Sequence, residues 1–344
     1  MLNRGKGGVL SGVDQPTGKR EGQRQSARAR LRAAAGSREA GLLLTTAIVS
    51  AALALLVPDA FLSSKNLVSV LTGTIYDLPL AAGMTLVLIL GGIDLSVGAV
   101  LGLCGVVIAM LLRAGAGVPI SILLGLLLGG AAGAVNGICV ARFRIAPFIA
   151  TLGMMSIARG TTTVLTSGYF LSGLPRQYQR IGQGTLLGIP YPVYVVVALL
   201  LAMDYGLRNW RPLNDAFYAG ANPDAAELSG IPVRKLVFAG FVASGLLAAL
   251  AGIFMTSRLA MGYARFGEGA ELKAIAAAVI GGASLSGGSG SISGMFLGVL
   301  LLAVVNNGFV LLNGSVYWQA VVSGAILVVA IAVDAYRRRK EERE

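Results

Sequence analysis

Histidine is absent from this chain of 344 residues, and charged residues make up only 13% of it. The absence of histidine excludes histidine ligands for metals, Ser-His catalysis and histidine-based proton relays. A soluble globular chain has about a quarter of its residues charged, so most of this chain is unsuited to face water. Both cysteines, Cys104 and Cys139, lie inside apolar stretches. They predict small packing residues rather than a disulfide framework.

Apolar residues, in contrast, make up 55% of the chain, and 48 residues are glycine. Glycine is frequent in membrane helices because it lets their backbones approach closely. We therefore expect an all-α polytopic membrane protein of about ten transmembrane helices, several of them broken by glycine. The ten apolar runs that predict these helices are 41–57, 67–90, 96–113, 118–141, 146–167, 191–207, 233–257, 272–286, 291–312 and 316–334. The leader before the first run is too long for a signal peptide, so this run is expected to remain as an uncleaved helix.

The net charge of +12 is concentrated at the two ends of the chain. Residues 1–40 are rich in Gly, Arg, Gln and Ser and predict a disordered basic tail, whereas 337–344 form a second charged tail. Residues 41–336 form the transmembrane domain. Basic residues beside apolar runs are typical of cytoplasmic segments, so ten spans place both termini in the cytoplasm. The tails lack the folded basic face with aromatic residues that would indicate nucleic-acid binding.

The stretch GGIDLSVG, from Gly91 to Gly98, places the ionisable Asp94 between two apolar runs. A charge near the membrane interior is costly and usually marks a solute path, a partner charge or a capped helix end. The Asp94 carboxylate is suited to cap the helix that follows it. Capping and direct solute contact are compatible, and both interpretations stay open.

A second stretch, GGASLSGG from Gly281 to Gly288, repeats the order of the first stretch 190 residues later. Glycine-interrupted apolar segments at corresponding places in two halves of a chain point to a transport site between the repeats. The alternative is that glycine-rich apolar stretches resemble each other through composition alone. We interpret the two stretches as a pseudo-repeat.

The loop at about 208–235 contains the signals of a short helix between two spans. Asn222 followed by Pro223 predicts its start, and Gly230 followed by Pro232 predicts its end. A helix of about two turns is marginal in isolation. It is therefore either a simple connector or a helix that seats in a groove of a partner protein.

No catalytic motif is present. The chain lacks a nucleotide-binding G-x-x-x-x-G-K-[ST] stretch, an H-E-x-x-H motif and a G-x-S-x-G motif. Glu268, Glu271 and Lys273 lie beside an apolar run and are interpreted as an interfacial cluster. If ATP supplies energy, a different chain must hydrolyse it.

From about Phe61 to Asp334 the chain resembles the ribose/xylose/arabinose-type permease family of bacterial ABC importers. GGIDLSVG is the hallmark of that family and is unchanged here. The chain is also similar to the family at Pro147–Gly160, Ala270–Gly290 and Asn307–Gly308, with Gln319 and Asp334 beyond. The loop from Asp224 to Gly230 is similar to the EAA loop of ABC permeases, with Asp where the signature has Glu.

The resemblance implies the permease subunit of an ATP-driven importer of a monosaccharide or related polyol in the bacterial inner membrane. Its implied partners are ABC ATPase subunits, a periplasmic sugar-binding protein, a second permease copy or homologue, and membrane lipid. The chain itself would need no cofactor, because ATP is used by the partner subunits. The resemblance assigns the ATPase-coupling loop to Asn222, Asp224, Ala225, Ala226, Glu227 and Gly230. For the translocation path we expect Asp94, Ser96, Thr151, Ser284, Ser286, Asn306 and Asn307.

The main alternative is an ion-coupled secondary transporter. Such a protein needs buried ionisable residues along the path of the coupling ion. The residues to test for that role are Asp77, Asp94 and Glu271. A third class, a membrane scaffold or receptor without transport, would need neither the second glycine break nor the docking loop.

Overall fold

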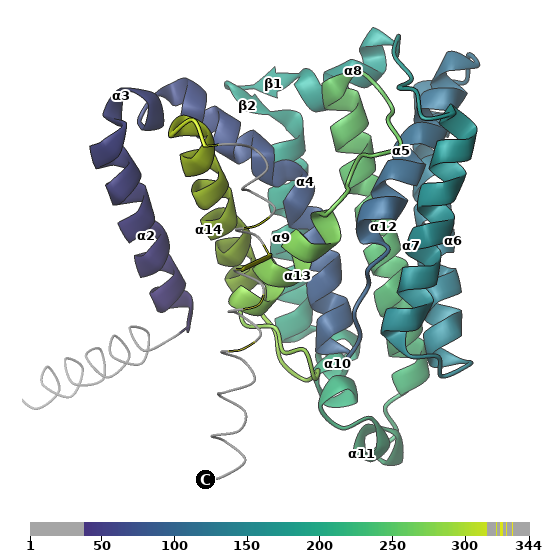
Figure 1. Ribbon diagram of the computed structural model, residues 1–344. Helices are drawn as coiled ribbons and strands as arrows, with labels where there is room; N and C mark the ends of the chain where they lie inside the picture. Colours follow the sequence, from purple (N-terminus) through teal and green to yellow (C-terminus); the bar gives the residue numbers. More distant parts are fainter. Residues whose placement is uncertain (1–37, 315–320, 322–323, 326–327, 329–331, 333–344) are drawn as a thin grey trace, which may run out of the picture.

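The computed structural model describes residues 38–314 together with 321, 324–325, 328 and 332. The chain is an all-α polytopic membrane protein, and the only strands in the described part form one short hairpin, β1 (Thr185–Leu186) and β2 (Ile189–Pro190). The helices, shown in Figure 1, are α2 (Arg38–Leu56), α3 (Pro58–Phe61), α4 (Ser64–Ile89), α5 (Val97–Arg113), α6 (Val118–Ala141), α7 (Pro147–Thr166), α8 (Arg176–Gln183), α9 (Tyr191–Asn209), α10 (Arg211–Ala221), α11 (Pro223–Leu228), α12 (Val233–Leu259), α13 (Ala270–Ile280) and α14 (Ile292–Leu311).

Seven of the described helices are long and apolar enough to cross a membrane: α2, α4, α6, α7, α9, α12 and α14. The apolar helix α5 has 17 residues and is shorter than these spans. The run predicted at 272–286 corresponds to α13, which has only 11 residues and covers about half of a ~30 Å hydrocarbon core. This helix ends at Ile280 because a Gly-Gly pair follows, and Gly282 has a φ of +108° that L side chains rarely adopt. Outside the described residues lie most of the predicted run 316–334, residues 1–37 of the first tail and the tail 337–344.

The helix α4 forms the centre of the bundle, with α12, α13 and α14 packed against it. Its inward residues Ala81, Ala82 and Met84 are fully buried, whereas α2 lies at one edge of the bundle against α14 (Figure 1). Close approach of α6 to α12 depends on glycine. A side chain on Gly129 would lie 2.6 Å from the Cβ of Ala249, which is the small-residue packing that membrane helices use.

The two ends of the bundle differ. The end that carries α3, α8 and the hairpin is called here the α8 end, and the opposite end, with α10 and α11, is the α11 end (Figure 1). The buried Tyr178 holds α8 to α12, because its hydroxyl donates to the carbonyl oxygen of Ile253 at 3.2 Å. Burial raises the pKa of the Tyr178 phenol, so it stays protonated as a hydrogen-bond donor.

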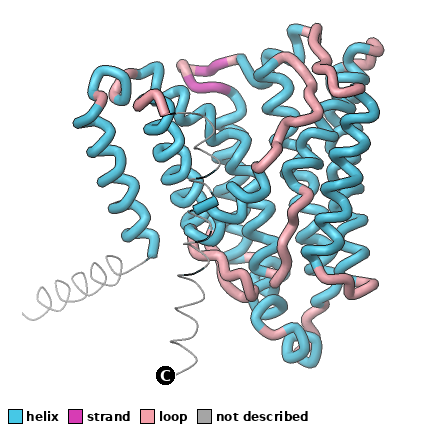
Figure 2. The backbone as a smooth tube through the Cα atoms, in the orientation of Figure 1, coloured by secondary structure: helices cyan, strands magenta, loops and turns pink. Residues whose placement is uncertain are grey.

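Unwound segments interrupt the bundle at both members of the pseudo-repeat. Figure 2 shows them as loops between helices, one joining α4 to α5 over residues 90–96 and one joining α13 to α14 over residues 281–291. A third unwound segment, 260–269, joins α12 to α13. Non-helical backbone at membrane depth is tolerated only where protein buries it or where it lines a cavity, so these segments mark the places where function is expected.

Candidate functional site

Asp94 lies in the first unwound segment and is 1% exposed. One of its carboxylate oxygens, Oδ1, accepts hydrogen bonds from the backbone N–H of Ser96 at 3.0 Å and from the Ser96 hydroxyl at 2.6 Å. The other, Oδ2, accepts from the Ser244 hydroxyl of α12 at 2.8 Å. The carboxylate therefore fixes the turn that starts α5 and joins this turn to α12. In this conformation both of its oxygens are engaged within the protein.

The same segment is also held by α6 and α7. The amide Nδ2 of Asn136 donates to the Ser96 hydroxyl at 2.9 Å, and the Thr151 hydroxyl donates to the carbonyl oxygen of Ile93 at 3.2 Å. Three of the predicted path residues, Asp94, Ser96 and Thr151, thus meet in one buried network. Asn136 and Ser244 complete this network, and nothing in the sequence pattern had singled them out.

The two glycine-rich stretches of the pseudo-repeat touch each other. The N–H of Gly288 donates to the carbonyl oxygen of Ile89 at 2.9 Å, which joins the second unwound segment to the end of α4. Gly220, in the last turn of α10, fits between them, because a Cβ there would overlap the carbonyl oxygen of Ile89. A Cβ on Gly287 would likewise lie only 2.9 Å from the Cα of Gly91. We call this contact of Ile89–Gly91, Gly220 and Gly287–Gly288 the glycine junction.

Both predicted serines of the second stretch lie next to this junction. The backbone N–H of Ser286 donates to the Ser284 hydroxyl at 3.2 Å, and the N–H of Ser284 donates to the carbonyl oxygen of Ser289 at 3.0 Å. These bonds shape the turn between α13 and α14. The serines lie toward the α11 end and apart from the Asn306 and Asn307 pair on α14.

At the α11 end, α11 is the short helix that the Asn-Pro signal predicts. Asn222 caps it by accepting a hydrogen bond from the Ala225 N–H at 3.0 Å, and Gly230, with a φ of +83°, turns the chain into α12. Ala226 is buried against Ala219 of α10 and packs near Leu90 of the first unwound segment. The loop therefore packs directly against the glycine junction.

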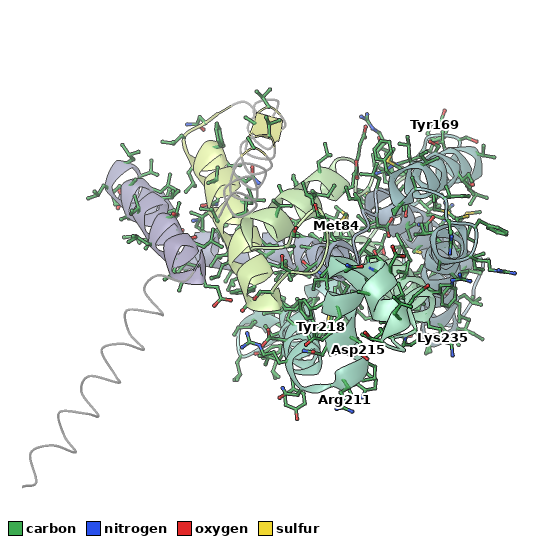
Figure 3. The ribbon with its side chains drawn as sticks, turned by 90° about the horizontal axis from the view of Figure 1, so that it is seen from below. Met84, Tyr169, Arg211, Asp215, Tyr218 and Lys235 are labelled. Atoms are coloured by element: carbon green, nitrogen blue, oxygen red, sulfur yellow. The ribbon has the colours of Figure 1, made fainter. Side chains whose placement is uncertain are left out.

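The outer surface of this loop is exposed. Asp224, Ala225 and Glu227 face solvent, and Glu227 lies 3.8 Å from the guanidinium of Arg234. Figure 3 shows this end of the molecule from below, with Arg211, Asp215, Tyr218 and Lys235 arranged around it. Leu228, at the end of α11, is 91% exposed. Nothing in the sequence pattern had indicated that this apolar side chain would be exposed.

A polar pocket of about 270 Å³ lies between α4, α13 and α14. Its polar lining consists of Ser69, Asp77, Lys273, Asn306 and Asn307. Lys273, interpreted together with Glu268 and Glu271 as an interfacial cluster, lines this pocket. Glu268 instead pairs with Arg265 at 2.7 Å, and the pocket also contains Asp77.

The rim of this polar pocket is fixed by a pair of amides. Asn307 donates to the Oδ1 of Asn66 at 2.7 Å, and Asn66 donates to the Oδ1 of Asn307 at 3.1 Å. This reciprocal pair joins α14 to the first turn of α4. Asn306, the other predicted amide, lines the pocket from the next position along α14.

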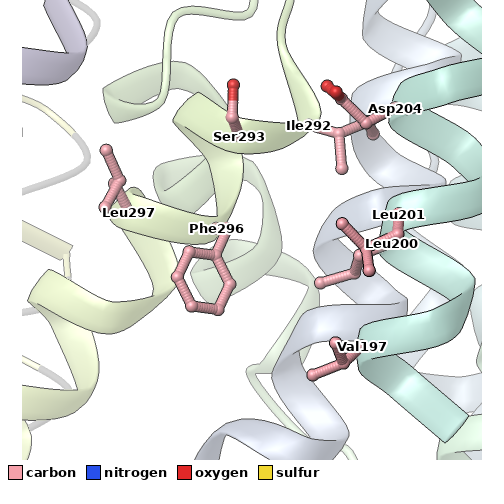
Figure 4. Close-up of a pocket in the computed structure, with 8 residues that line it drawn as sticks. All are labelled: Val197, Leu200, Leu201, Asp204, Ile292, Ser293, Phe296 and Leu297. Carbon is pink, nitrogen blue, oxygen red and sulfur yellow. The ribbon is translucent and has the colours of Figure 1, made fainter. Parts of the chain in front are cut away.

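A larger pocket of about 350 Å³ lies between α9 and α14 (Figure 4). Its lining is mostly aliphatic and aromatic, including Leu200, Leu201 and Phe296. It offers few hydrogen-bonding groups to a polar solute. Among the described residues, no three acidic or cysteine side chains come together in a group that could hold a metal ion.

Comparison with known proteins identifies the family. Residues 66–331 match the family described as the permease component of the branched-chain amino acid transport system. The chain belongs to this family of ABC-transporter permeases. The ribose import permease RbsC of Escherichia coli K12 is 40% identical to it over 297 residues, which cover 85% of this permease and 91% of RbsC.

Other relatives act on other sugars, as their names state. The L-arabinose ABC transporter permease AraH of Azospirillum brasilense is 35% identical over 300 residues, or 87% of this permease and 88% of AraH. The D-allose transport permease AlsC of E. coli K12 is 34% identical over 295 residues, or 86% of this permease and 90% of AlsC. No solved structure matches the chain. Together these relatives place the permease in the ribose/arabinose type of the family.

Proposed function

We propose that this permease is the membrane-spanning subunit of an ATP-driven importer of a monosaccharide or related polyol. The observation that carries the proposal is the similarity along 85% or more of the chain to permeases named for ribose, arabinose and allose. We assign the protein to the bacterial inner membrane, with the α11 end and both termini in the cytoplasm. Its polar pocket supplies carboxylate, ammonium and amide groups, which suit the hydroxyls of such a solute.

Energy for import comes from separate ATPase subunits, because this sequence has no phosphate-binding loop of its own. We assign their docking surface to the coupling loop, with Asp224, Ala225, Glu227 and Leu228 on its exposed face. When α11 moves, its buried Ala226 displaces α10, and α10 in turn displaces the glycine junction. A periplasmic sugar-binding protein delivers the solute at the α8 end, and a second copy or homologue of the permease completes the path.

In the translocation path we place Asn306 and Asn307 at the polar pocket and Ser284 and Ser286 at the α11 end. Asp94, Ser96 and Thr151 hold the unwound segment between these regions through the contacts described above. An uncharged solute needs no fixed counter-charge along such a route. Selectivity then resides mainly in the binding protein.

Reconstitution tests the proposal against the ion-coupled alternative. The purified permease, its ATPase and its binding protein are incorporated into proteoliposomes, and uptake of labelled D-ribose, L-arabinose and D-allose is measured. We expect uptake of at least one sugar that requires ATP and the binding protein and persists when an uncoupler removes the proton gradient. Uptake by the permease alone, abolished by the uncoupler and indifferent to ATP, would reject the proposal.

A further inference from the structure

We propose that the polar pocket between α4, α13 and α14 is a binding station for one neutral polyhydroxy solute, with Asp77, Lys273 and Asn306 as its hydrogen-bonding groups. This inference rests on the proposed function and adds to it the residues that hold the solute within the membrane domain.

Both charged groups lie at membrane depth. Asp77 is at the middle of α4, a span of 26 residues, and Lys273 is in the first turn of the apolar α13. Charged residues in such segments are costly against lipid and face a water-filled cavity or a partner charge. The three ion pairs among the described residues lie elsewhere, so no carboxylate oxygen of Asp77 lies within 4.0 Å of the Lys273 ammonium. We infer that they face a wet pocket.

The space fits a single sugar ring. A volume of about 270 Å³ is several times the ~30 Å³ share of one water molecule, so it admits a small polyhydroxy molecule. On the side of the α11 end a second, small cavity of about 10 Å³ lies between Asp77, Ala81 and Ala277. There Gly298 packs against the carbonyl of Ala277 so closely that no side chain fits between them. The pocket is thus closed on the side of the α11 end.

The lining offers both donors and acceptors of hydrogen bonds to the hydroxyl groups of a solute. The Asp77 carboxylate accepts hydrogen bonds, the Lys273 ammonium donates them, and the amide of Asn306 does both. The Asn307 amide is bonded to Asn66 at the rim of the pocket. The neighbouring amide of Asn306 is therefore the one that can bind a ligand. A neutral polyol satisfies both charges at once. The carboxylate and the ammonium give the pocket no net charge, so it favours neither a small anion nor a small cation over a neutral solute.

The first arm of the test measures access of water to the pocket, independently of which sugar is carried. In a background in which Cys104 and Cys139 are replaced by alanine, Asn306→Cys and the lipid-facing control Leu127→Cys are treated with a charged, membrane-impermeant thiol reagent. Leu127 is 58% exposed on α6. We expect Asn306→Cys to react at least about tenfold faster, because only a hydrated thiol ionises readily. Equal rates at the two positions would overturn the proposal.

The second arm measures ligand contact in the reconstituted complex. Asp77→Asn and Lys273→Met are assayed for uptake of D-ribose, L-arabinose and D-allose and for the amount of ATPase that co-purifies. We expect uptake to fall about tenfold or more, as loss of a charged hydrogen bond predicts, while ATPase association stays at the parental level. Parental uptake by both variants would overturn the role in binding, as would a parent complex that takes up none of the three sugars.

The two arms separate this inference from the proposed function. A parent permease that recovers no ATPase contradicts the proposed function, whereas the labelling result still decides whether the pocket is wet. To distinguish misfolding from loss of ligand contact, the double variant Asp77→Asn with Lys273→Met is included, because it leaves no unpaired charge in the membrane. Restored uptake in the double variant would assign the two residues to structure and overturn the binding role.

Discussion

Gly220 is the position where we expect the smallest substitution to have the largest effect on coupling. It lies in the last turn of α10, two residues before Asn222, which caps α11. In Gly220→Ala the added methyl group overlaps the carbonyl oxygen of Ile89 and lies 2.9 Å from the backbone nitrogen of Gly288. Both obstacles are main-chain atoms, which cannot rotate aside as a flexible side chain does.

The net effect follows from two opposing contributions. Alanine in a helix is more favourable than glycine by about 1 kcal/mol at most, whereas forcing an extra methyl group into a packed site costs up to about 3 kcal/mol. The remaining strain of roughly 2 kcal/mol is relieved if α10 moves away from the glycine junction. That shift lowers the population of the engaged arrangement by a factor of about 5 to 30.

The assay compares ATP hydrolysis with sugar uptake in the same proteoliposomes. We expect Gly220→Ala to keep its ATPase subunits and their hydrolysis, while sugar moved per ATP falls about tenfold. The matched control is Gly41→Ala in α2, where an added methyl group meets nothing within 4 Å. A Gly220→Ala complex with the same transport per ATP as Gly41→Ala would refute the role of the junction in coupling.

Three further predictions test the remaining parts of the site. Asp94→Asn removes a charged acceptor of three hydrogen bonds. We expect the free energy of unfolding, measured in detergent, to fall by about 1.5–3 kcal/mol. Unchanged stability with abolished uptake would indicate direct solute contact instead. Asn222→Ala removes the cap of α11 and costs about 1 kcal/mol locally, so ATPase recovery should fall while the melting temperature of the bundle does not, and undiminished recovery would contradict this. A double-mutant cycle with Asn66→Leu, Asn307→Leu and their double variant should give a coupling energy of about 0.6–1.7 kcal/mol. A value near zero would mean that the amide pair does not hold α4 to α14.

Hydrophobic runs sufficed to predict most of the membrane helices. The boundaries of α6 and α7 lie within one residue of the predicted runs, because Pro, Gly and Arg mark their ends. The run 272–286 was predicted too long, since hydropathy does not register that Gly282 takes a φ suited to glycine. The length and apolarity of a run do not indicate where its helix ends. The end can be predicted only where the flanking residues, such as Pro, Gly or Arg, signal it.

Contacts between distant segments were beyond the sequence. The sequence does not predict that Gly220 fits between Ile89 and Gly288, because this fit depends on three backbones converging. The pocket groups Asp77 and Lys273 are separated by 196 positions. Their only common signal was an ionisable side chain inside or beside an apolar run. That signal indicates that a charge needs a partner or water, but it does not indicate which residue lies opposite.

The proposed docking of an ATPase at α11 can be tested with two leucines at opposite ends of the molecule. Leu228 on α11 and Leu187 in the hairpin at the α8 end are both 91% exposed, so replacing either by aspartate leaves the core unchanged. The tagged permease and both variants are purified in mild detergent, and the recovered ATPase is quantified by mass spectrometry. We expect Leu228→Asp to lose the ATPase, whereas Leu187→Asp and the parent retain it. Equal recovery with all three proteins, or no ATPase with the parent, would contradict it.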